Sequence, residues 1–260
     1  MRDFPRQTGK RIGMLTPSSN TVLEPYTSAM FAPFGDEASA HFGRFRVVEI
    51  SMSDTSQGQF TNAPILEAAK HLAEAEVDLI AWNGTSASWL GLEKDRALCA
   101  MIEAETGIKA TSTVLAYDAL YRAMGVKTLG LVTPYISEVQ ELIIENYAAL
   151  GIEVIADERL QEKVNYAFAT FSADHVSALI REVAKSAPDA ISIVCTNFRG
   201  APQAALIEAE TGIPILDSVS VTAAHCMREV GLDPARVTGW GAVFQTFSRL
   251  PKTFQQREKK

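Results

Sequence analysis

Asp189-Ala-Ile-Ser-Ile-Val-Cys195-Thr-Asn197 has a near copy earlier in the chain, Asp78-Leu-Ile-Ala-Trp-Asn-Gly84-Thr-Ser86. The two stretches align without a gap, because the opening aspartates, and likewise Gly84 and Cys195, lie 111 positions apart. In each copy an acidic residue precedes a short apolar run, and small polar residues follow it. This pattern predicts a buried parallel strand whose carboxyl end carries polar side chains. One end carries a thiol and the other a glycine.

Two further pairs of segments repeat in the same order. Ile12-Gly-Met-Leu-Thr-Pro17 matches Leu129-Gly-Leu-Val-Thr-Pro134 at a spacing of 117 positions. The heptapeptide Ile102-Glu-Ala-Glu-Thr-Gly-Ile108 recurs unchanged at 207–213, a spacing of 105 positions. In both copies a helix is predicted to end at the glycine, which readily adopts the left-handed conformation found after helices. Three ordered pairs with similar spacings indicate that a βαβαβ unit has been duplicated.

Amphipathic helical patterns alternate with short apolar strands along the chain. Helices are predicted at 65–75, 92–106, 114–124, 136–150, 176–184 and 220–230, and strands near 45–50, 77–82, 152–155 and 190–194. Such alternation is typical of α/β proteins, in which helices cover both faces of a parallel sheet. The duplication then predicts two pseudo-symmetric α/β half-domains with parallel sheets. Because ligands of such sheets bind outside the carboxyl ends of the strands, the active site is expected in the cleft between the halves.

Two polar stretches interrupt this alternation, at 51–62 and 161–170. Both are predicted to be loops. They are either mobile covers over the site or plain surface connections, and the sequence does not decide between the two.

The composition argues against several classes of partner. The 260 residues carry a net charge of −7, and the basic residues are scattered, so no nucleic-acid surface is expected. No apolar run reaches the roughly 18 residues that a transmembrane helix needs, and the first residues lack an apolar signal core. The sequence therefore predicts a cytosolic protein without a membrane partner.

The residues that usually hold metals and nucleotides form no recognisable pattern. Cys99, Cys195 and Cys226 are an odd and widely spaced set, which suggests neither a disulfide framework nor a zinc site. The histidines share no metal-ligand spacing. Neither a GxGxxG nor a P-loop pattern is present. We therefore expect no metal and no cofactor.

The two strand ends predict the chemistry of the cleft. Thiols at both ends would face a shared substrate from opposite sides, so that one could remove a proton from a carbon while the other returned one. Because Gly84 takes the place of one thiol, Cys195 is left as a single acid. Such an acid can protonate a carbanion-like intermediate that forms in another way, such as loss of carbon dioxide. The alternative for Cys195 is a buried structural cysteine.

Hydrogen-bond donors stand next to these strand ends. Thr85, Ser86 and Tyr135, with backbone N–H groups at the loop–helix junctions, are donors of the kind that would hold a carboxylate and its enediolate. Each also has a structural alternative. Thr85 and Ser86 can cap the helix that follows, and Tyr135 can be a packing aromatic residue.

An ordered set of short motifs resembles a known family. Gly84-Thr-Ser86, Val132-Thr-Pro-Tyr135 and Cys195, with the opening Pro17-Ser-Ser-Asn20, resemble the aspartate/glutamate racemase superfamily, in the branch that holds arylmalonate decarboxylase and maleate cis-trans isomerase. The resemblance covers nearly the whole chain. In that branch the isomerase pattern has cysteine at both strand ends, whereas the decarboxylase pattern has glycine at the first and cysteine at the second. Gly84 with Cys195 is similar to the decarboxylase.

By this resemblance Cys195 is the proton donor, at the end opposite Gly84. The resemblance also implies that Thr85, Ser86 and Tyr135 form the pocket that binds the two oxygens of the enediolate.

The opening turn is instead similar to the isomerase, in which the asparagine binds a substrate carboxylate. This implies a substrate-binding role for Asn20, together with Asn165, although asparagine also suits a turn by bonding its own backbone. Ser19 and Thr196, the neighbours of Asn20 and Cys195, complete the predicted substrate-binding set.

The resemblance further implies that the halves exchange their ends. The first half-domain would comprise residues 1–108 and 216–260, and the second residues 109–215.

Three functions stay open from the sequence. The first is a cofactor-independent decarboxylase of malonate-type or related small dicarboxylic acids, in which a single cysteine protonates an enediolate. The second is a maleate cis-trans isomerase or racemase-type isomerase of such acids. The third is a non-catalytic carboxylic-acid-binding protein. In each case the expected partner is a small carboxylic acid, and a homo-oligomer stays open. If the strand ends are mirrored, Gly84→Cys is expected to confer racemase activity towards the decarboxylation product.

Overall fold

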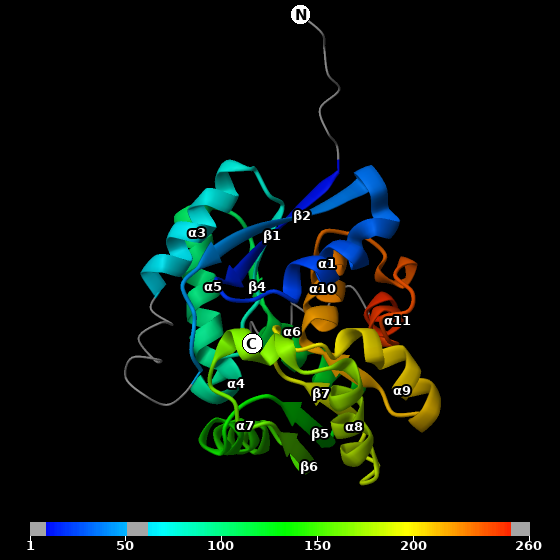
Figure 1. Cartoon of the computed structure of the whole chain (residues 1–260). Helices are drawn as coiled ribbons and strands as arrows, with labels where there is room; N and C mark the ends of the chain where they lie inside the picture. The colour runs from blue at the N-terminus through cyan, green and yellow to red at the C-terminus, as the bar shows by residue number, and fades with distance from the viewer. Residues whose placement is uncertain (1–8, 51–61, 251–260) are drawn as a thin grey trace, which may run out of the picture.

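Two four-stranded parallel sheets form the framework of the protein in a computed structural model that describes residues 9–50 and 62–250. Their strand orders are β2-β1-β3-β4 and β6-β5-β7-β8. Figure 1 shows the chain coloured from blue at the N-terminus to red at the C-terminus. The first sheet consists of β1 (Lys10–Pro17), β2 (Ala38–Phe45), β3 (Leu79–Trp82) and β4 (Ala110–Ser112). The second consists of β5 (Thr128–Thr133), β6 (Glu153–Arg159), β7 (Ala190–Ile193) and β8 (Ile215–Asp217). The predicted α/β class with two parallel-sheet halves is confirmed.

Helices connect the strands and cover the sheets. Those before β5 are α1 (Leu23–Phe31), the 3-10 helix η1 (Ala32–Glu37), α3 (Asn62–Glu74), α4 (Ala87–Leu90), α5 (Leu92–Thr106) and α6 (Thr113–Met124). Those after β5 are α7 (Ser137–Ala149), η2 (Asn165–Thr170), α8 (Ala173–Ala184), η3 (Ala201–Gln203), α9 (Ala204–Thr211), α10 (Ser218–Glu229), η4 (Pro234–Arg236) and α11 (Val243–Arg249). Each of the six predicted helices is present, with ends within three residues of those expected.

The duplication is visible in individual hydrogen bonds. Asp78 accepts the backbone N–H of Arg11 at 2.8 Å, and its counterpart Asp189 accepts that of Thr128 at 2.8 Å. The acidic residue at the start of each copy therefore joins β3 or β7 to the neighbouring central strand. Similarly, Glu103 accepts the backbone N–H of Ala110, and Glu208 that of Ile215, both at 2.9 Å. Residues at the repeat spacings thus make the same bonds in both halves.

One strand was predicted in the wrong place. A strand was expected near 45–50, but β2 covers Ala38–Phe45 and ends where the expected strand begins. It is an edge strand whose side chains are mostly half-exposed, so its sequence lacks the apolar run of a buried strand. Val47 and Ile50 are buried for a different reason. Their segment crosses to the second half, where the N–H of Ile50 bonds the carbonyl of Lys163 at 2.8 Å.

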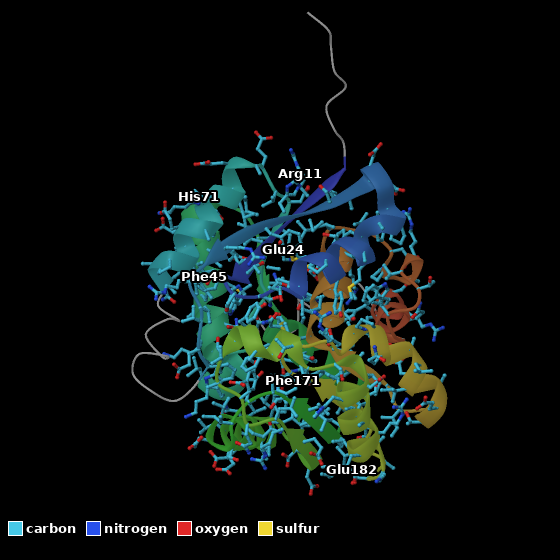
Figure 2. The ribbon with its side chains drawn as sticks, viewed as in Figure 1. Arg11, Glu24, Phe45, His71, Phe171 and Glu182 are labelled. Carbon is cyan, nitrogen blue, oxygen red and sulfur yellow. The ribbon has the colours of Figure 1, made fainter. Side chains whose placement is uncertain are left out.

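The first sheet, with β1 and β2, lies above the second, with β5 and β6, in the view of Figure 1. Helix α10, which follows the second sheet, contacts α1 of the first half as well as α6. Polar side chains such as those of His71 and Glu182 lie on the outside of the molecule (Figure 2). None of the described helices is both long and apolar enough to cross a membrane. The exchange of chain ends between half-domains stays a prediction, as does its boundary.

The two predicted loops fare differently. The stretch 51–62 falls outside the described residues except for Asn62, which begins α3. The stretch 161–170 is described, and its second half forms η2. This loop lies beside the cavity that both halves share, because Asn165 contributes to the lining of that cavity.

Candidate active site

The segments that follow β1, β3, β5 and β7 meet where the two halves face each other, and they enclose a cavity of about 20 Å³. Seven of the predicted site residues line it, namely Gly84, Thr85, Ser86, Tyr135, Asn165, Cys195 and Thr196. A space of this size holds about one water molecule. A dicarboxylic acid is larger, so binding one requires the lining to move apart.

Cys195 follows β7 and is 2% exposed. The backbone N–H of Asn197 donates to its Sγ at 3.4 Å. Burial raises the pKa of the Cys195 thiol to about 12, although the Asn197 N–H and the Tyr135 side chain lower it. The thiol is therefore protonated at neutral pH. That state suits a proton donor and makes Cys195 a weak nucleophile, because the thiolate is the nucleophilic form.

Tyr135 and Thr85 join the two halves across the cavity. The Tyr135 hydroxyl and Thr85 Oγ1 are 2.7 Å apart, and both side chains are buried. Burial raises the pKa of Tyr135 well above its ordinary value, and the neighbouring Cys195 adds to the rise. The tyrosine therefore keeps its O–H proton. Its ring is fixed by edge contacts with Trp89, at 5.4 Å between centroids, and Phe168, at 5.6 Å.

Ser86 stands at the N-cap position of α4 but makes no side-chain capping hydrogen bond. Its side chain is 6% exposed and lines the cavity. The structural alternative for Ser86, a helix cap, is therefore not what its hydroxyl does. With Thr85 and Tyr135 it gives the cavity three hydroxyl groups from two facing strand ends, which is a donor set suited to carboxylate oxygens.

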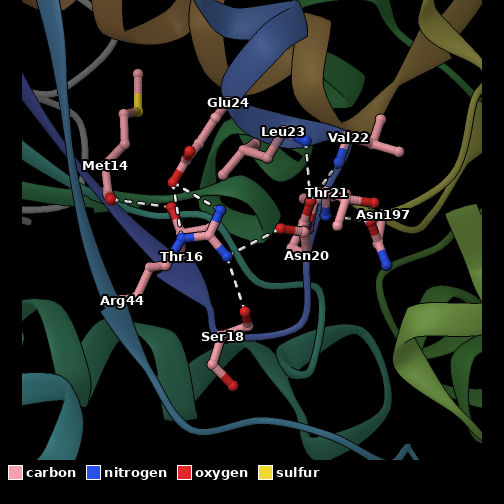
Figure 3. A network of polar contacts seen from close by, with 11 residues as sticks. Met14, Thr16, Ser18, Asn20, Thr21, Val22, Leu23, Glu24, Arg44 and Asn197 are labelled. Atoms are coloured by element: carbon pink, nitrogen blue, oxygen red, sulfur yellow. Dashed lines mark hydrogen bonds and ion pairs between the residues drawn. The ribbon is translucent and has the colours of Figure 1, made fainter.

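Pro17 lines the cavity, and the rest of the opening turn lies behind the cavity wall. Asn20 Oδ1 accepts the backbone N–H groups of Val22 and Leu23, both at 2.9 Å, at the start of α1 (Figure 3). Its Nδ2 donates to Thr196 Oγ1 at 3.2 Å. Arg44 bonds the carbonyls of Ser18 and Asn20 from the other side, so the turn is held at both ends. Asn20 therefore shapes the turn and supports Thr196, and it is absent from the cavity lining.

Ser19 and Asn165 connect the turn to the second half. Asn165 Nδ2 donates to Ser19 Oγ at 2.8 Å, and Ser19 Oγ donates to the Val47 carbonyl at 2.7 Å. Asn197, which was not among the predicted site residues, accepts the backbone N–H of Thr21 at 2.9 Å and donates to the Asn165 carbonyl at 2.6 Å. Its side chain thus fixes the segment that carries Cys195 to both halves.

Gly84 lies beside an indole ring. A Cβ atom added at Gly84 would lie 1.8 Å from Cζ2 of Trp82 and 2.2 Å from Cε2, far inside the van der Waals contact distance of about 3.5 Å. The Trp82 N–H donates to the carboxylate of Asp95, which is 2% exposed, and Ser112 bonds the same carboxylate. A side chain at position 84 therefore requires the Trp82 ring to move. The predicted effect of Gly84→Cys depends on that movement.

Five cavity-lining residues do not belong to the predicted set of site residues, namely Pro17, Val47, Ile50, Trp82 and Trp89. Pro17 and Trp82 end β1 and β3, so the rule that sites form at strand ends could have included them. Val47 and Ile50 gave no usable signal, because their burial depends on the contact with Lys163 in the other half. Among the described residues, no group of three or more His, Cys, Asp or Glu side chains is arranged to hold a metal ion.

The fold and the cavity define an α/β protein of two pseudo-symmetric halves whose facing strand ends enclose a single thiol. The sequence profile of the arylmalonate decarboxylase family matches residues 12–244. The chain therefore belongs to the arylmalonate decarboxylase/maleate isomerase family of the Asp/Glu racemase superfamily. The enzymes of this family, decarboxylases and isomerases, need no cofactor.

Similar proteins include both kinds of enzyme. The chain is 24% identical over 245 residues to the maleate isomerase of Pseudomonas putida, an alignment that spans 90% of this chain and 96% of the relative. It resembles a cysteine-to-serine mutant of Nocardia farcinica maleate cis-trans isomerase with a covalently bound succinylcysteine intermediate, with a TM-score of 0.82, 23% identity and coverage of 90% and 98%. It also resembles arylmalonate decarboxylase, with a TM-score of 0.74, 20% identity and coverage of 90% and 99%.

Proposed function

We propose that the protein is a cofactor-independent decarboxylase of malonate-type or related small dicarboxylic acids. The observation that carries this proposal is the asymmetry of the cavity. A buried thiol stands at one strand end, whereas Gly84 at the equivalent end has no side chain and faces the Trp82 ring. Such a cavity offers one acid and no opposing base of the same kind.

The proposed reaction uses each part of this cavity. One carboxylate of the substrate leaves as carbon dioxide, and the electron pair of the broken C–C bond passes into an enediolate. Thr85, Ser86 and Tyr135 donate hydrogen bonds to the enediolate oxygens. The S–H group of Cys195 then protonates the α-carbon, and the resulting thiolate regains a proton from water. The substrate carbon receives its proton from the side of Cys195 only.

The state of the thiol supports this order of events. Burial raises the pKa of Cys195 to about 12, so the enzyme at neutral pH holds the proton that the reaction consumes. An enediolate carbon is basic enough to remove a proton from such a thiol. A mechanism that begins with attack by a thiolate would first have to ionise the same group at a large cost, since each pKa unit corresponds to about 1.4 kcal/mol.

The second candidate is a cis-trans isomerase of maleate-like acids. The observations that favour it are the relatives named as maleate isomerases and the opening turn at 17–20. In this alternative Cys195 would add to the double bond as a thiolate and leave after rotation about the resulting single bond. The third candidate, a carboxylic-acid-binding protein without activity, keeps the same cavity and lacks turnover.

Two assays on the same protein separate these candidates. Carbon dioxide release is measured with malonate, methylmalonate and related diacids, and conversion of maleate to fumarate is followed by the change in ultraviolet absorbance. The proposal expects carbon dioxide from at least one malonate, no fumarate, and loss of turnover in Cys195→Ala. Fumarate formation without carbon dioxide would establish the isomerase. Saturable binding of a diacid, detected as a thermal shift without either product, would establish the binding protein.

A further inference from the structure

Trp82 separates two hollow spaces in the first half. Its ring forms part of the wall of the candidate active site, and it also lines a second hollow of about 490 Å³. Ser86 borders both spaces, and the second one is lined by apolar side chains such as Leu98 and Met101 as well as by Lys94 and Asp95. The indole ring is therefore the partition between a small enclosed cavity and a larger hollow.

The ring is held in this position from two sides. Its N–H donates to the buried carboxylate of Asp95, and the ring packs against Phe45 at a centroid distance of 5.1 Å. Trp82 is 1% exposed. A ring with a fixed polar end and a packed face has little freedom to swing into the second hollow. It therefore stays over Gly84 and fills the space beside that residue.

The equivalent position in the second half shows what the ring replaces. Ile193 lies 111 positions after Trp82, at the spacing that also relates Gly84 to Cys195. Where the strand ends in Ile193, position 195 carries a thiol that lines the cavity. Where it ends in Trp82, a Cβ atom at position 84 would lie within 2.4 Å of three carbons of the ring. The last side chain of the strand, two positions before residue 84 or 195, thus decides whether an acid can stand at that later position.

We propose that Trp82, positioned by Asp95, determines the specificity of this site: its ring takes the place of a second acid and restricts substrates to malonates with small α-substituents, of about methyl size. This inference rests on the proposed decarboxylation and names its substrate class. Discrimination by a closed apolar wall is worth about 10- to 200-fold per methylene group, so an aryl substituent is excluded in the presence of the ring.

A double-mutant cycle tests, without an activity assay, whether the Trp82 ring fills the space beside Gly84. Gly84→Ala adds only the Cβ atom, and Trp82→Ile copies the residue that precedes Cys195 in the other half. We expect Gly84→Ala to lower the melting temperature by about 5 °C or more with Trp82 present, and by less than about 2 °C in the Trp82→Ile background. Trp89→Leu is the matched control, because Trp89 lines the cavity but not the second hollow. In that background Gly84→Ala should lower the melting temperature as much as it does with the wild-type residues.

Ligand size is the second readout. Methylmalonate and phenylmalonate are compared by binding and by carbon dioxide release, and the preference for methylmalonate should fall at least about 10-fold in Trp82→Ile. Asp95→Leu should move the preference in the same direction, and Asp95→Asn, which keeps an acceptor for the indole N–H, should restore it.

Two results would overturn the inference. One is an equal fall in melting temperature on Gly84→Ala in the wild-type, Trp82→Ile and Trp89→Leu backgrounds. The other is an unchanged preference for methylmalonate over phenylmalonate in Trp82→Ile. A coupled cycle and a changed binding preference, without carbon dioxide from either acid, would support the role of Trp82 and contradict the decarboxylase.

Discussion

The two halves of this protein solve the same packing problem with different residues. In the first half Trp82, Asp95 and Ser112 meet behind the strand end, and Asp95 supplies the buried carboxylate. At the repeat spacings, their counterparts in the second half are Ile193, Gly200 and Asp217. A Cβ atom at Gly200 would lie 2.5 Å from Ile193 and 2.8 Å from the Asp217 carboxylate, so these three residues also meet.

Each half therefore keeps one buried carboxylate, but at positions that are not equivalent. Asp95 corresponds to Gly200, and Asp217 corresponds to Ser112. Asp217 uses its carboxylate to begin α10, accepting the N–H groups of Val219 and Ser220 at 2.8 and 3.3 Å. Asp95 uses its carboxylate to hold the Trp82 indole. The exchange leaves room for a thiol at one strand end and fills that room with a ring at the other. A symmetric fold has thereby produced a one-sided site.

The strongest test of this asymmetry removes its acid. Cys195→Ala should lower the rate of carbon dioxide release by about 1000-fold, since a positioned general acid typically contributes 100- to 10,000-fold. Diacid binding should persist. Cys226→Ala is the matched control: it also removes a fully buried thiol, but one outside the cavity lining, and it should leave the rate unchanged. Equal rates for wild type and Cys195→Ala would remove Cys195 from the mechanism.

The donors that cross between the halves should have the next largest effect. Tyr135→Phe removes the hydroxyl that lies 2.7 Å from Thr85 Oγ1, and we expect a loss of about 100-fold in kcat. Tyr121→Phe removes a hydroxyl that is equally buried and lies 2.7 Å from Ser192 Oγ, away from the cavity. It should lower the free energy of unfolding by about 1 kcal/mol without changing kcat. A similar kcat for both variants would show that Tyr135 serves packing alone.

The buried carboxylate of the first half should make stability depend on pH. Burial raises the pKa of Asp95 to about 7, although Ser112 and Trp82 lower it. Because the folded state holds this proton more tightly than the unfolded chain, its stabilising effect is complete below pH 4 and is lost as the pH rises through 7. The free energy of unfolding, measured by urea denaturation, should therefore fall between pH 5 and 9 by about 2 kcal/mol less in Asp95→Asn than in wild type. Parallel pH profiles would contradict this assignment.

The smallest expected change concerns the thiol of the second half. Burial raises the pKa of Cys195 to about 12, so the rate of decarboxylation should stay level from pH 7 to 9. An unperturbed thiol, with a pKa of about 8.5, would lose much of its proton over this range. A decline centred near pH 8.5 would show that Cys195 ionises as an exposed cysteine does.

The features that the sequence predicted well are local ones. Strand, polar end and helix follow one another within short windows, and the repeated spacings are sufficient to make Gly84 and Cys195 equivalent. The same logic brought Thr85, Ser86 and Tyr135 to one cavity. Parallel strands place their carboxyl ends on one edge, so a local pattern was sufficient to predict this proximity.

The features that it missed depend on distant partners. Trp82 is a buried residue, and its position over Gly84 requires Asp95, thirteen residues later on another element. The direction of Asn20 is set by two backbone N–H groups of α1 and by Thr196 in the other half. Edge strand β2 has no buried run to reveal it. Each of these depends on contacts that no short stretch of sequence contains.

The central claim is that the substrate carbon receives its proton from one side, from Cys195. Decarboxylation of 2-fluoro-2-methylmalonate, whose α-substituents do not exceed methyl size, tests it directly through the chirality of the 2-fluoropropionate formed. The account predicts a single enantiomer from the wild-type protein. A racemic product formed at the active site would contradict it.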